Sequence, residues 1–247
     1  VAPPPVVPKD PKYRPYNKPS AIAHWLREAR PTEDVIVIID PDCMIVSRYD
    51  IVVEEGAPIA QQALFDYQGT DDDVPTQIAR RYCRNCTVLD PIAVPVIIHR
   101  RDLERLAPLW LQKTIEIRAD RKKWPKCWSD DKCSSSVGLS WTAEMFGYSF
   151  AAAELGLRHE IWDLQAVPEV DQAVITPFIH YHTPIKFHDG RRWYKRDGPD
   201  SCCKFPWPVP KGTSNTTREA LSRLRSAHAR LGETRHAWPP DFNTPES

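Results

Sequence analysis

One short segment constrains the fold of this chain more than any other. Five consecutive Val and Ile residues, Val35 to Ile39, are followed at once by Asp40-Pro41-Asp42. An unbroken β-branched run is typical of a strand covered on both faces, and it predicts a central strand of a mostly parallel sheet. Residues just past the end of such a strand lie where open α/β sheets bind their ligands. The segment therefore predicts an α/β fold with an acidic ligand site.

The two aspartates have a functional and a structural interpretation. Placing Asp40 and Asp42 together near a core is costly unless a positive charge compensates them. A divalent cation that carries a phosphorylated ligand is the natural candidate, because hard cations take oxygen ligands and neutralise phosphate charge. The alternative is a turn in which one of the aspartates caps the next element. A D-x-D tripeptide is short and leaves both interpretations open.

The bulk composition excludes some classes of protein. A chain of 247 residues can bury one substantial core with a small appendage. The 33 basic and 33 acidic residues balance to a formal charge of +0, which argues against a nucleic-acid partner bound by a broad basic field. No stretch approaches the ~18 apolar residues of a membrane span, and no signal peptide opens the chain. Because the chain begins with Val, we expect a processed, excised or partial sequence.

Prolines and alternating periodicities predict the domain organisation. Proline clusters near both ends are typical of extended connectors, so we expect a Pro-rich leader over residues 1–16. A main α/β domain over residues 17–210 follows, and residues 211–247 form a helix and a disordered tail. Within the main domain, strands alternate with helices, which favours an α/β sandwich with a mostly parallel sheet.

Three helices have clear sequence signals. The first begins near Asn17, with Pro19 in its tolerated first turn. The second begins at Asp102 and passes Pro108, where a kink is expected. Its inward-facing residues are Leu103, Leu106, Trp110, Leu111, Thr114 and Ile117. The third covers residues 141–157 and has a glycine, Gly156, at the C-cap position. Later strands are predicted by the apolar runs at residues 90–98, 161–164 and 173–179.

The cysteines favour an oxidising compartment. The C-x-x-C pair of Cys83 and Cys86 invites a zinc interpretation, but no second C-x-x-C or paired histidine completes the set of ligands. Disulfides are the favoured interpretation, with Cys127 and Cys133 as candidates for a short loop. The same compartment suits two N-glycosylation sequons, Asn85-Cys86-Thr87 and Asn215-Thr216-Thr217.

Two histidines are candidate metal ligands. His180 ends a strand-like run, as Asp42 follows one, and an imidazole with carboxylates makes a manganese-type site that diphosphate oxygens can complete. His182 is a competing ligand, because within a strand it would share a face with His180. The structural alternative is an ordinary hydrogen bond from each histidine at a strand end.

Glu144 and Lys18 are further candidates. Glu144 falls in the first turn of the helix predicted over residues 141–157, where the helix dipole alone would favour a carboxylate. Its functional interpretation is an acid near a ligand hydroxyl, which it orients or from which it accepts a proton. Lys18 precedes the strand that carries the aspartates and could reach a phosphate, although a surface lysine needs no such role.

Several segments together resemble one known family. The most specific is Glu144–His159 (EMFGYSFAAAELGLRH), supported by residues 17–26, 40–42 and 110–120. These resemble the plant and algal Golgi glycosyltransferases that modify hydroxyproline-rich proteins, in particular the peptidyl serine α-galactosyltransferases. Residues 90–97 look more like the hydroxyproline O-arabinosyltransferase branch. The resemblance spans roughly residues 13–210.

The resemblance implies a fold and a site. The fold would be a GT-A-like sandwich that binds a nucleotide sugar, here lacking its first strand–helix unit. Asp42 and His180 would ligate Mn²⁺ or another divalent cation on the UDP diphosphate, and Asp40 would contact the ribose or a metal-bound water. Both branches retain the anomeric configuration, so Glu144 would only orient acceptor or donor. One departure is Tyr181-His182-Thr183, where the family has Tyr-Gly or Tyr-Thr after the histidine.

We therefore expect a metal-dependent, retaining glycosyltransferase that moves a sugar, with galactose favoured, from a UDP-sugar donor to serine or hydroxyproline hydroxyls of hydroxyproline-rich secretory proteins. The alternatives are a hydroxyproline O-arabinosyltransferase, a non-catalytic lectin-like or scaffold relative, and a zinc-stabilised interaction module built on Cys83 and Cys86. The expected location is the Golgi or ER lumen, with membrane attachment only through a segment absent from this chain.

Overall fold

A computed structural model describes residues 13–63, 79–83, 86, 89–120, 139–167, 176–187, 189–194, 209 and 211–234. The chain forms two compact units. The larger unit comprises Val1–Ile39 and Asp50–Leu164, and the smaller unit comprises Asp40–Tyr49 and Gln165–Ser247. The chain thus passes from the larger to the smaller unit directly after Ile39. The Val/Ile run and the two aspartates that follow it in the sequence therefore belong to different units.

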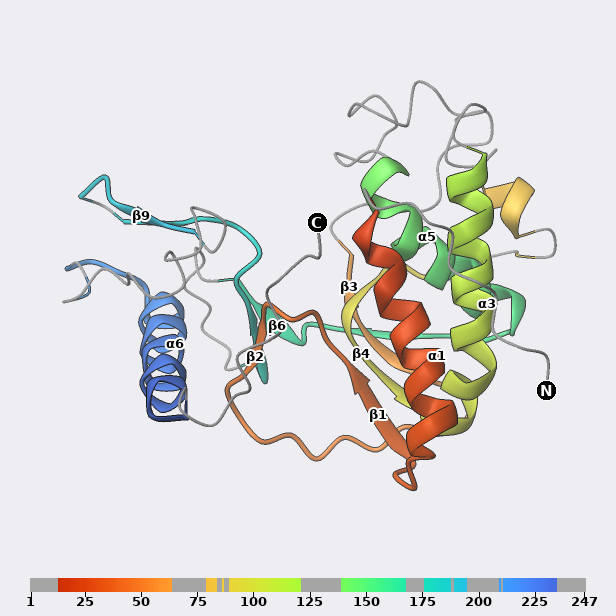
Figure 1. The fold of residues 1–247 in the computed structure, drawn as a ribbon, viewed down its shortest axis with the longest axis horizontal. Helices are drawn as coiled ribbons and strands as arrows, with labels where there is room; N and C mark the ends of the chain where they lie inside the picture. The colour runs from red at the N-terminus through yellow and green to blue at the C-terminus, as the bar shows by residue number, and fades with distance from the viewer. Residues whose placement is uncertain are drawn as a thin grey trace, which may run out of the picture. The chain divides into compact units, whose positions relative to one another are not determined.

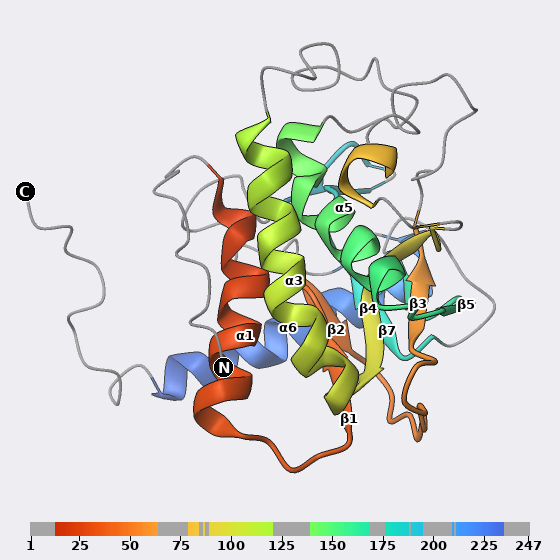
Figure 2. The same ribbon diagram turned by 90° about the vertical axis from the view of Figure 1, so that its right-hand side faces the viewer.

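The larger unit is built on a four-stranded sheet with the order β1-β4-β3-β5 (Figures 1 and 2). Its strands are β1 (Val35–Ile38), β3 (Ile59–Gln62), β4 (Ile92–His99) and β5 (Glu160–Trp162). β1 and β3 both run antiparallel to β4, and β5 joins β3 in parallel. The sheet is mixed, so the prediction of a mostly parallel sheet is wrong. An apolar run reports how well a strand is covered but carries no information on the direction of its neighbours.

β1 is not the central strand that its composition predicted. It stands at one end of the strand order and is only partly buried, apart from Ile38. β4 takes the central place. Its register against β3 jumps from Val96 to Ala93, and its pairing with β1 stops at Val96, so Pro95, which follows a cis peptide bond, lies outside both ladders. A residue without an N–H is accommodated at such a bulge.

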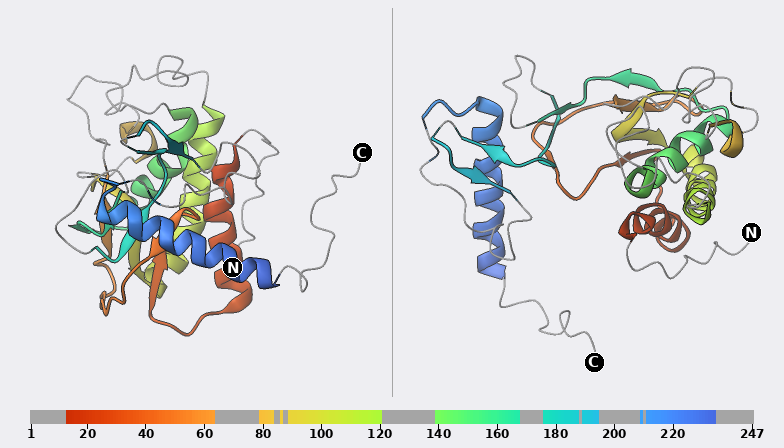
Figure 3. Two further views of the ribbon diagram at one scale, coloured as in Figure 1. Left: turned by 90° about the vertical axis from the view of Figure 1, so that its left-hand side faces the viewer. Right: turned by 90° about the horizontal axis from the view of Figure 1, so that it is seen from above.

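Three helices cover one face of this sheet (Figures 2 and 3). They are α1 (Asn17–Ala29), which follows the short 3-10 helix η1 (Arg14–Tyr16), α3 (Arg100–Ala119) and α5 (Leu139–Glu154). α3 lies between the other two, and all six residues predicted to face inward are buried. It crosses α5 closely at Gly147, where an added Cβ would meet the backbone nitrogen of Thr114 at 3.0 Å. The helical periodicity therefore predicted this layer correctly.

The predicted C-cap of α5 is also confirmed. Gly156 has a φ of +72°, a left-handed conformation that favours glycine. Its N–H donates to the carbonyl of Ala153, and the N–H of Leu157 donates to that of Ala152, which is the Schellman pattern. Leu157 is buried, so the cap also carries its usual apolar contact.

The smaller unit has a three-stranded sheet with the order β2-β7-β6 and a two-stranded sheet, β8-β9. Its elements are β2 (Cys43–Ile45), β6 (Gln165–Ala166), β7 (Phe178–His180), β8 (Ile185–Lys186), β9 (Arg192–Trp193) and α6 (Asn215–Thr234). β2 is antiparallel to β7, whereas β6 is parallel to it. On α6, Ala220 and Leu221 pack in the two small cores of this unit. Arg223 anchors the helix by donating to the carbonyl oxygens of Ile45 and Val46.

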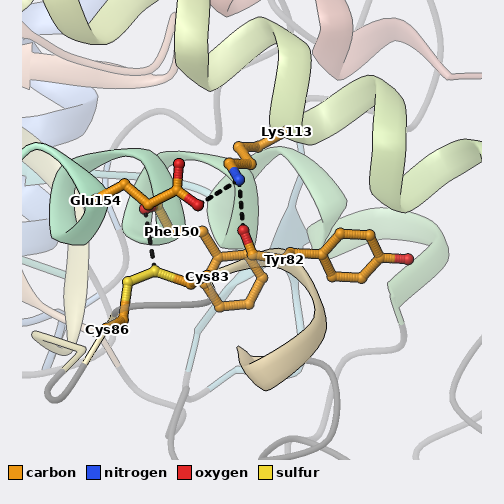
Figure 4. The surroundings of a disulfide bond; sticks show 6 residues. All are labelled: Tyr82, Cys83, Cys86, Lys113, Phe150 and Glu154. Carbon is orange, nitrogen blue, oxygen red and sulfur yellow. Dashed lines mark hydrogen bonds and ion pairs between the residues drawn. A yellow bond between two sulfur atoms is a disulfide. The ribbon is translucent and has the colours of Figure 1, made fainter.

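Cys83 and Cys86 form a disulfide (Figure 4). Two sulfur atoms that bond each other cannot both bind zinc as thiolates, so the zinc-stabilised module is contradicted. Beside the disulfide, the Lys113 ammonium lies 2.6 Å from the Glu154 carboxylate and donates to the Tyr82 carbonyl oxygen (Figure 4). Cys127 and Cys133, and the loop that contains them, lie outside the described residues.

Two further expectations concern the compartment. Among the residues that the structure describes, no helix combines the length and the apolar character needed to cross a membrane. Asn215 is exposed at the start of α6, where an acceptor asparagine would be accessible, whereas Asn85 and Thr87 lie outside the described part of the chain.

Candidate metal centre

The D-x-D segment forms a turn that leads into β2. The Cys43 N–H donates to the Asp40 carbonyl oxygen at 2.9 Å, which closes the turn around Pro41. β2 then pairs with β7 so that Cys43 lies opposite His180, and the Tyr181 N–H donates to the Asp42 carbonyl oxygen at 3.1 Å. The backbone of one short ladder therefore holds the aspartates beside the histidine.

Their side chains converge. His180 Nε2 lies 3.3 Å from Asp42 Oδ1 and 4.0 Å from Asp40 Oδ2. One ligand atom from each residue lies within 4.8 Å of the others, and within the described part of the chain this is the one group of three or more such side chains that could hold a metal ion. The structure thus brings together the three residues predicted as metal ligands, although His180 is far from the aspartates in the sequence.

The donor set favours a particular class of cation. Two carboxylates that approach the same point repel each other, and a shared cation would remove that repulsion. Oxygen donors with one imidazole suit Mn²⁺ or a similar divalent ion, while thiolates select softer metals. Cys43, although opposite His180, is not a member of the group. The side chains of Asp40, Asp42 and His180 are 26%, 17% and 12% exposed.

Gln165 also contacts the group. Its Oε1 lies 3.1 Å from Nδ1 of His180, on the side of the ring away from the aspartates. The sequence pattern did not single out Gln165, because a glutamine in a mixed polar and apolar segment has no recognisable motif. Only the pairing of β6 with β7 makes it a neighbour of His180.

His182 has a different place from the one expected. β7 ends at His180, so the argument that both histidines share a strand face does not apply. The two rings lie 4.5 Å apart between centroids, in a tilted arrangement, but His182 is not a member of the three-residue group.

Lys18 and Glu144 both belong to the larger unit, where they contact each other. Lys18 Nζ lies 3.5 Å from Glu144 Oε1. α5 begins at Leu139, so Glu144 lies in its second turn and the expected first-turn position is wrong. The start of a helix depends on tertiary contacts that periodicity does not report. Here the Glu144 N–H donates to the Tyr13 hydroxyl, and the Trp110 Nε1–H donates to the Glu144 carbonyl oxygen.

The surroundings of Glu144 are charged and largely buried. Burial, together with the nearby Glu144 carboxylate, raises the pKa of Tyr13 far above its ordinary value. The Arg118 guanidinium lies over the Tyr13 ring at 4.0 Å, a cation–π contact. The Glu144 carboxylate thus faces Lys18 of α1, while its backbone on α5 bonds Tyr13 and the α3 residue Trp110. Sequence reasoning missed the partners Tyr13 and Arg118.

Comparison with known proteins gives a consistent result. The model of the hydroxyproline O-arabinosyltransferase family N-terminal domain matches residues 3–161, which include both aspartates but not His180. The peptidyl serine alpha-galactosyltransferase of Arabidopsis thaliana is 32% identical over 224 residues, which cover 85% of this chain and 27% of that protein. Hydroxyproline O-arabinosyltransferase 3 of the same plant is 29% identical over 173 residues, or 68% of this chain and 44% of the relative.

The peptidyl serine alpha-galactosyltransferase of Chlamydomonas reinhardtii is 29% identical over 168 residues, which cover 62% of this chain and 21% of that protein. The chain therefore spans between about a fifth and a half of the length of these relatives. No solved structure matches the chain.

Proposed function

This chain belongs to the hydroxyproline O-arabinosyltransferase family, and from that premise we propose that it is the catalytic part of a glycosyltransferase. On this proposal it moves a sugar from a UDP-sugar to serine or hydroxyproline hydroxyls of a protein acceptor in the secretory pathway, with retention of the anomeric configuration. Galactose is favoured over arabinose, because the similarity to a relative named as a galactosyltransferase is higher and covers more of the chain. The sheet with a D-x-D turn behind β1 would correspond to a GT-A-like fold.

The observation that carries the proposal is the convergence of Asp40, Asp42 and His180. Two carboxylates and an imidazole fit a divalent cation such as Mn²⁺, and a diphosphate could supply the remaining ligands. When bound, the cation would neutralise the donor diphosphate and the charge that develops on departing UDP. Asp42 and His180 would hold it directly, and Asp40 would ligate it or contact the ribose.

The residues of the chain itself would bind and orient. The hydrogen bond between Tyr181 and the Asp42 carbonyl fixes the turn against β7, so both ligands are positioned before any donor arrives. Lys18 and Glu144 belong to the larger unit, where their 3.5 Å ion pair engages both side chains, so we assign neither of them a role at the cation of the smaller unit.

The proposal is tested by UDP binding, measured by titration calorimetry with and without Mn²⁺, and by hydrolysis of a panel of UDP-sugars. We expect UDP binding to require Mn²⁺ and the variants Asp42→Ala and His180→Ala to lose the Mn²⁺-dependent part. Asp189→Ala is the matched control, because Asp189 is an exposed aspartate of the same unit that bonds Arg191. Metal-independent UDP or sugar binding, equal in all variants, would instead support a lectin-like relative.

A further inference from the structure

We propose that Gln165 is a positioning residue of the metal centre, which holds the His180 ring so that its Nε2 faces Asp40 and Asp42. The inference deepens the proposed function and rests on it. On this proposal Gln165 does not bind the cation itself. The inference follows from the pairing of β6 with β7 and from the different partners of the two ring nitrogens of His180.

The register of the smaller unit places Gln165 where it can act on His180. β6 and β7 are parallel, and Gln165 lies beside Phe178. His180 follows Phe178 by two residues, so the two side chains leave the same face of β7. The Gln165 side chain is long enough to extend along β7 from Phe178 to His180. Its Oε1 lies 3.1 Å from His180 Nδ1.

The chemistry of the ring explains why a glutamine oxygen suits this position. A neutral imidazole carries one N–H and one lone pair, and a metal takes the nitrogen with the lone pair. His180 Nε2 is the nitrogen that faces the carboxylates, at 3.3 Å from Asp42 Oδ1. The N–H must then sit on Nδ1, where the Gln165 oxygen accepts it. Partners of this kind fix the tautomer and the orientation of metal-binding histidines.

A neutral amide at position 165 also affects the net charge of the site differently from a carboxylate. Asp40 and Asp42 already bring two negative charges to the group, and an acidic residue at position 165 would add a third. Glutamine supplies the acceptor without that charge, so the net charge of the loaded site stays closer to neutral. Gln165→Glu is the conservative variant, because it keeps an acceptor oxygen at the same reach and changes only the charge.

The test is direct binding of Mn²⁺ to the full chain, followed by the electron paramagnetic resonance signal of free Mn²⁺, without UDP or any activity measurement. We expect Gln165→Leu to weaken Mn²⁺ binding about 10–100-fold, as the loss of such outer partners typically does. Gln165→Asn, which withdraws the oxygen by one methylene, should weaken binding in the same direction. Gln165→Glu should restore most of the affinity.

Gln112→Leu is the control for a general effect of replacing glutamine, because Gln112 is exposed on α3 and its amide donates to Glu116. Thermal unfolding in EDTA tests whether a variant is unfolded or has only lost the orientation of the His180 ring. Gln165→Leu and Gln165→Asn should unfold near the wild-type temperature. Unchanged Mn²⁺ affinity in both variants overturns the role of Gln165 while the metal site stands. Absence of Mn²⁺ binding by the wild type overturns the metal site and, with it, this inference.

Discussion

The ionisable side chains of the two units differ in their partners. In the larger unit, buried charges are arranged with immediate partners: Lys113 with Glu154, and Asp102 with Arg105 and the Gly56 N–H. In the smaller unit, two carboxylates and an imidazole approach one point, and their side chains are 12–26% exposed. Partnered buried charges join helices and loops, whereas the three convergent side chains are those of the proposed cation site. The comparison separates residues that hold the fold from residues that would hold a ligand.

The largest expected effect comes from breaking a pair in the larger unit. Lys113→Met leaves the Glu154 carboxylate and the Tyr82 carbonyl without their shared ammonium, and should lower the free energy of unfolding by about 3 kcal/mol. Denaturant unfolding monitored by circular dichroism measures it. Arg27→Met, which removes a residue of the same charge from an exposed ion pair, should lower the free energy of unfolding by less than about 0.5 kcal/mol. Equal costs for the two variants would refute the structural role assigned to the pair.

The second largest expected effect is the stabilisation of the protein by Mn²⁺ bound in the smaller unit. Mn²⁺ at about 100 times its dissociation constant should stabilise the wild-type protein by about 2.7 kcal/mol, and chelation with EDTA should remove this gain. Asp42→Asn should abolish the gain while changing the metal-free stability by less than about 1 kcal/mol, since the residue is partly exposed. Thermal unfolding with and without Mn²⁺ gives both values. A variant that still gains stability from Mn²⁺ would exclude Asp42 as a ligand.

The smallest effect is a pH dependence confined to the larger unit. Burial lowers the pKa of His159, which contacts the Tyr148 hydroxyl and the Asp90 carboxylate. Burial alone would raise the pKa of Asp90, but hydrogen bonds from His159 and the Arg158 charge lower it overall. A lowered pKa in the folded state means that the unfolded chain binds more protons. Stability is then complete above the unfolded pKa and falls as the pH drops below it.

For His159 the loss begins near its unfolded pKa of about 6.5, and for Asp90 near about 3.8. The free energy of unfolding should therefore decrease as the pH falls from 7 to 5.5, because His159 takes up a proton more readily in the unfolded chain. His159→Gln, which keeps a neutral polar side chain, should flatten the profile in this interval. Chemical unfolding across the pH series measures it, and a parallel decrease in the variant would assign the effect to another group.

Sequence reasoning succeeded where the signal is local. The helical sequence signals correctly predicted that α1 and α3 exist, and the glycine at the end of α5 predicted the left-handed Gly156, although α3 begins at Arg100 and not at Asp102. Such signals are local because hydrogen bonds and side-chain contacts within a helix join residues three or four positions apart. Asp42 follows a β-branched run and His180 ends another apolar run, and these positions identified both residues as candidates. Their residue types and positions at strand ends were sufficient for that.

The tertiary structure alone decided which residues meet. The mixed direction of the sheets, the peripheral place of β1, the pairing of Lys18 with Glu144 and the contact of Gln165 with His180 all depend on strand register and helix packing. Register is set by many contacts between residues far apart in the chain, and a single sequence records none of them as a local pattern. The chain by itself therefore determined the helices and the chemistry available, and folding determined where that chemistry converges.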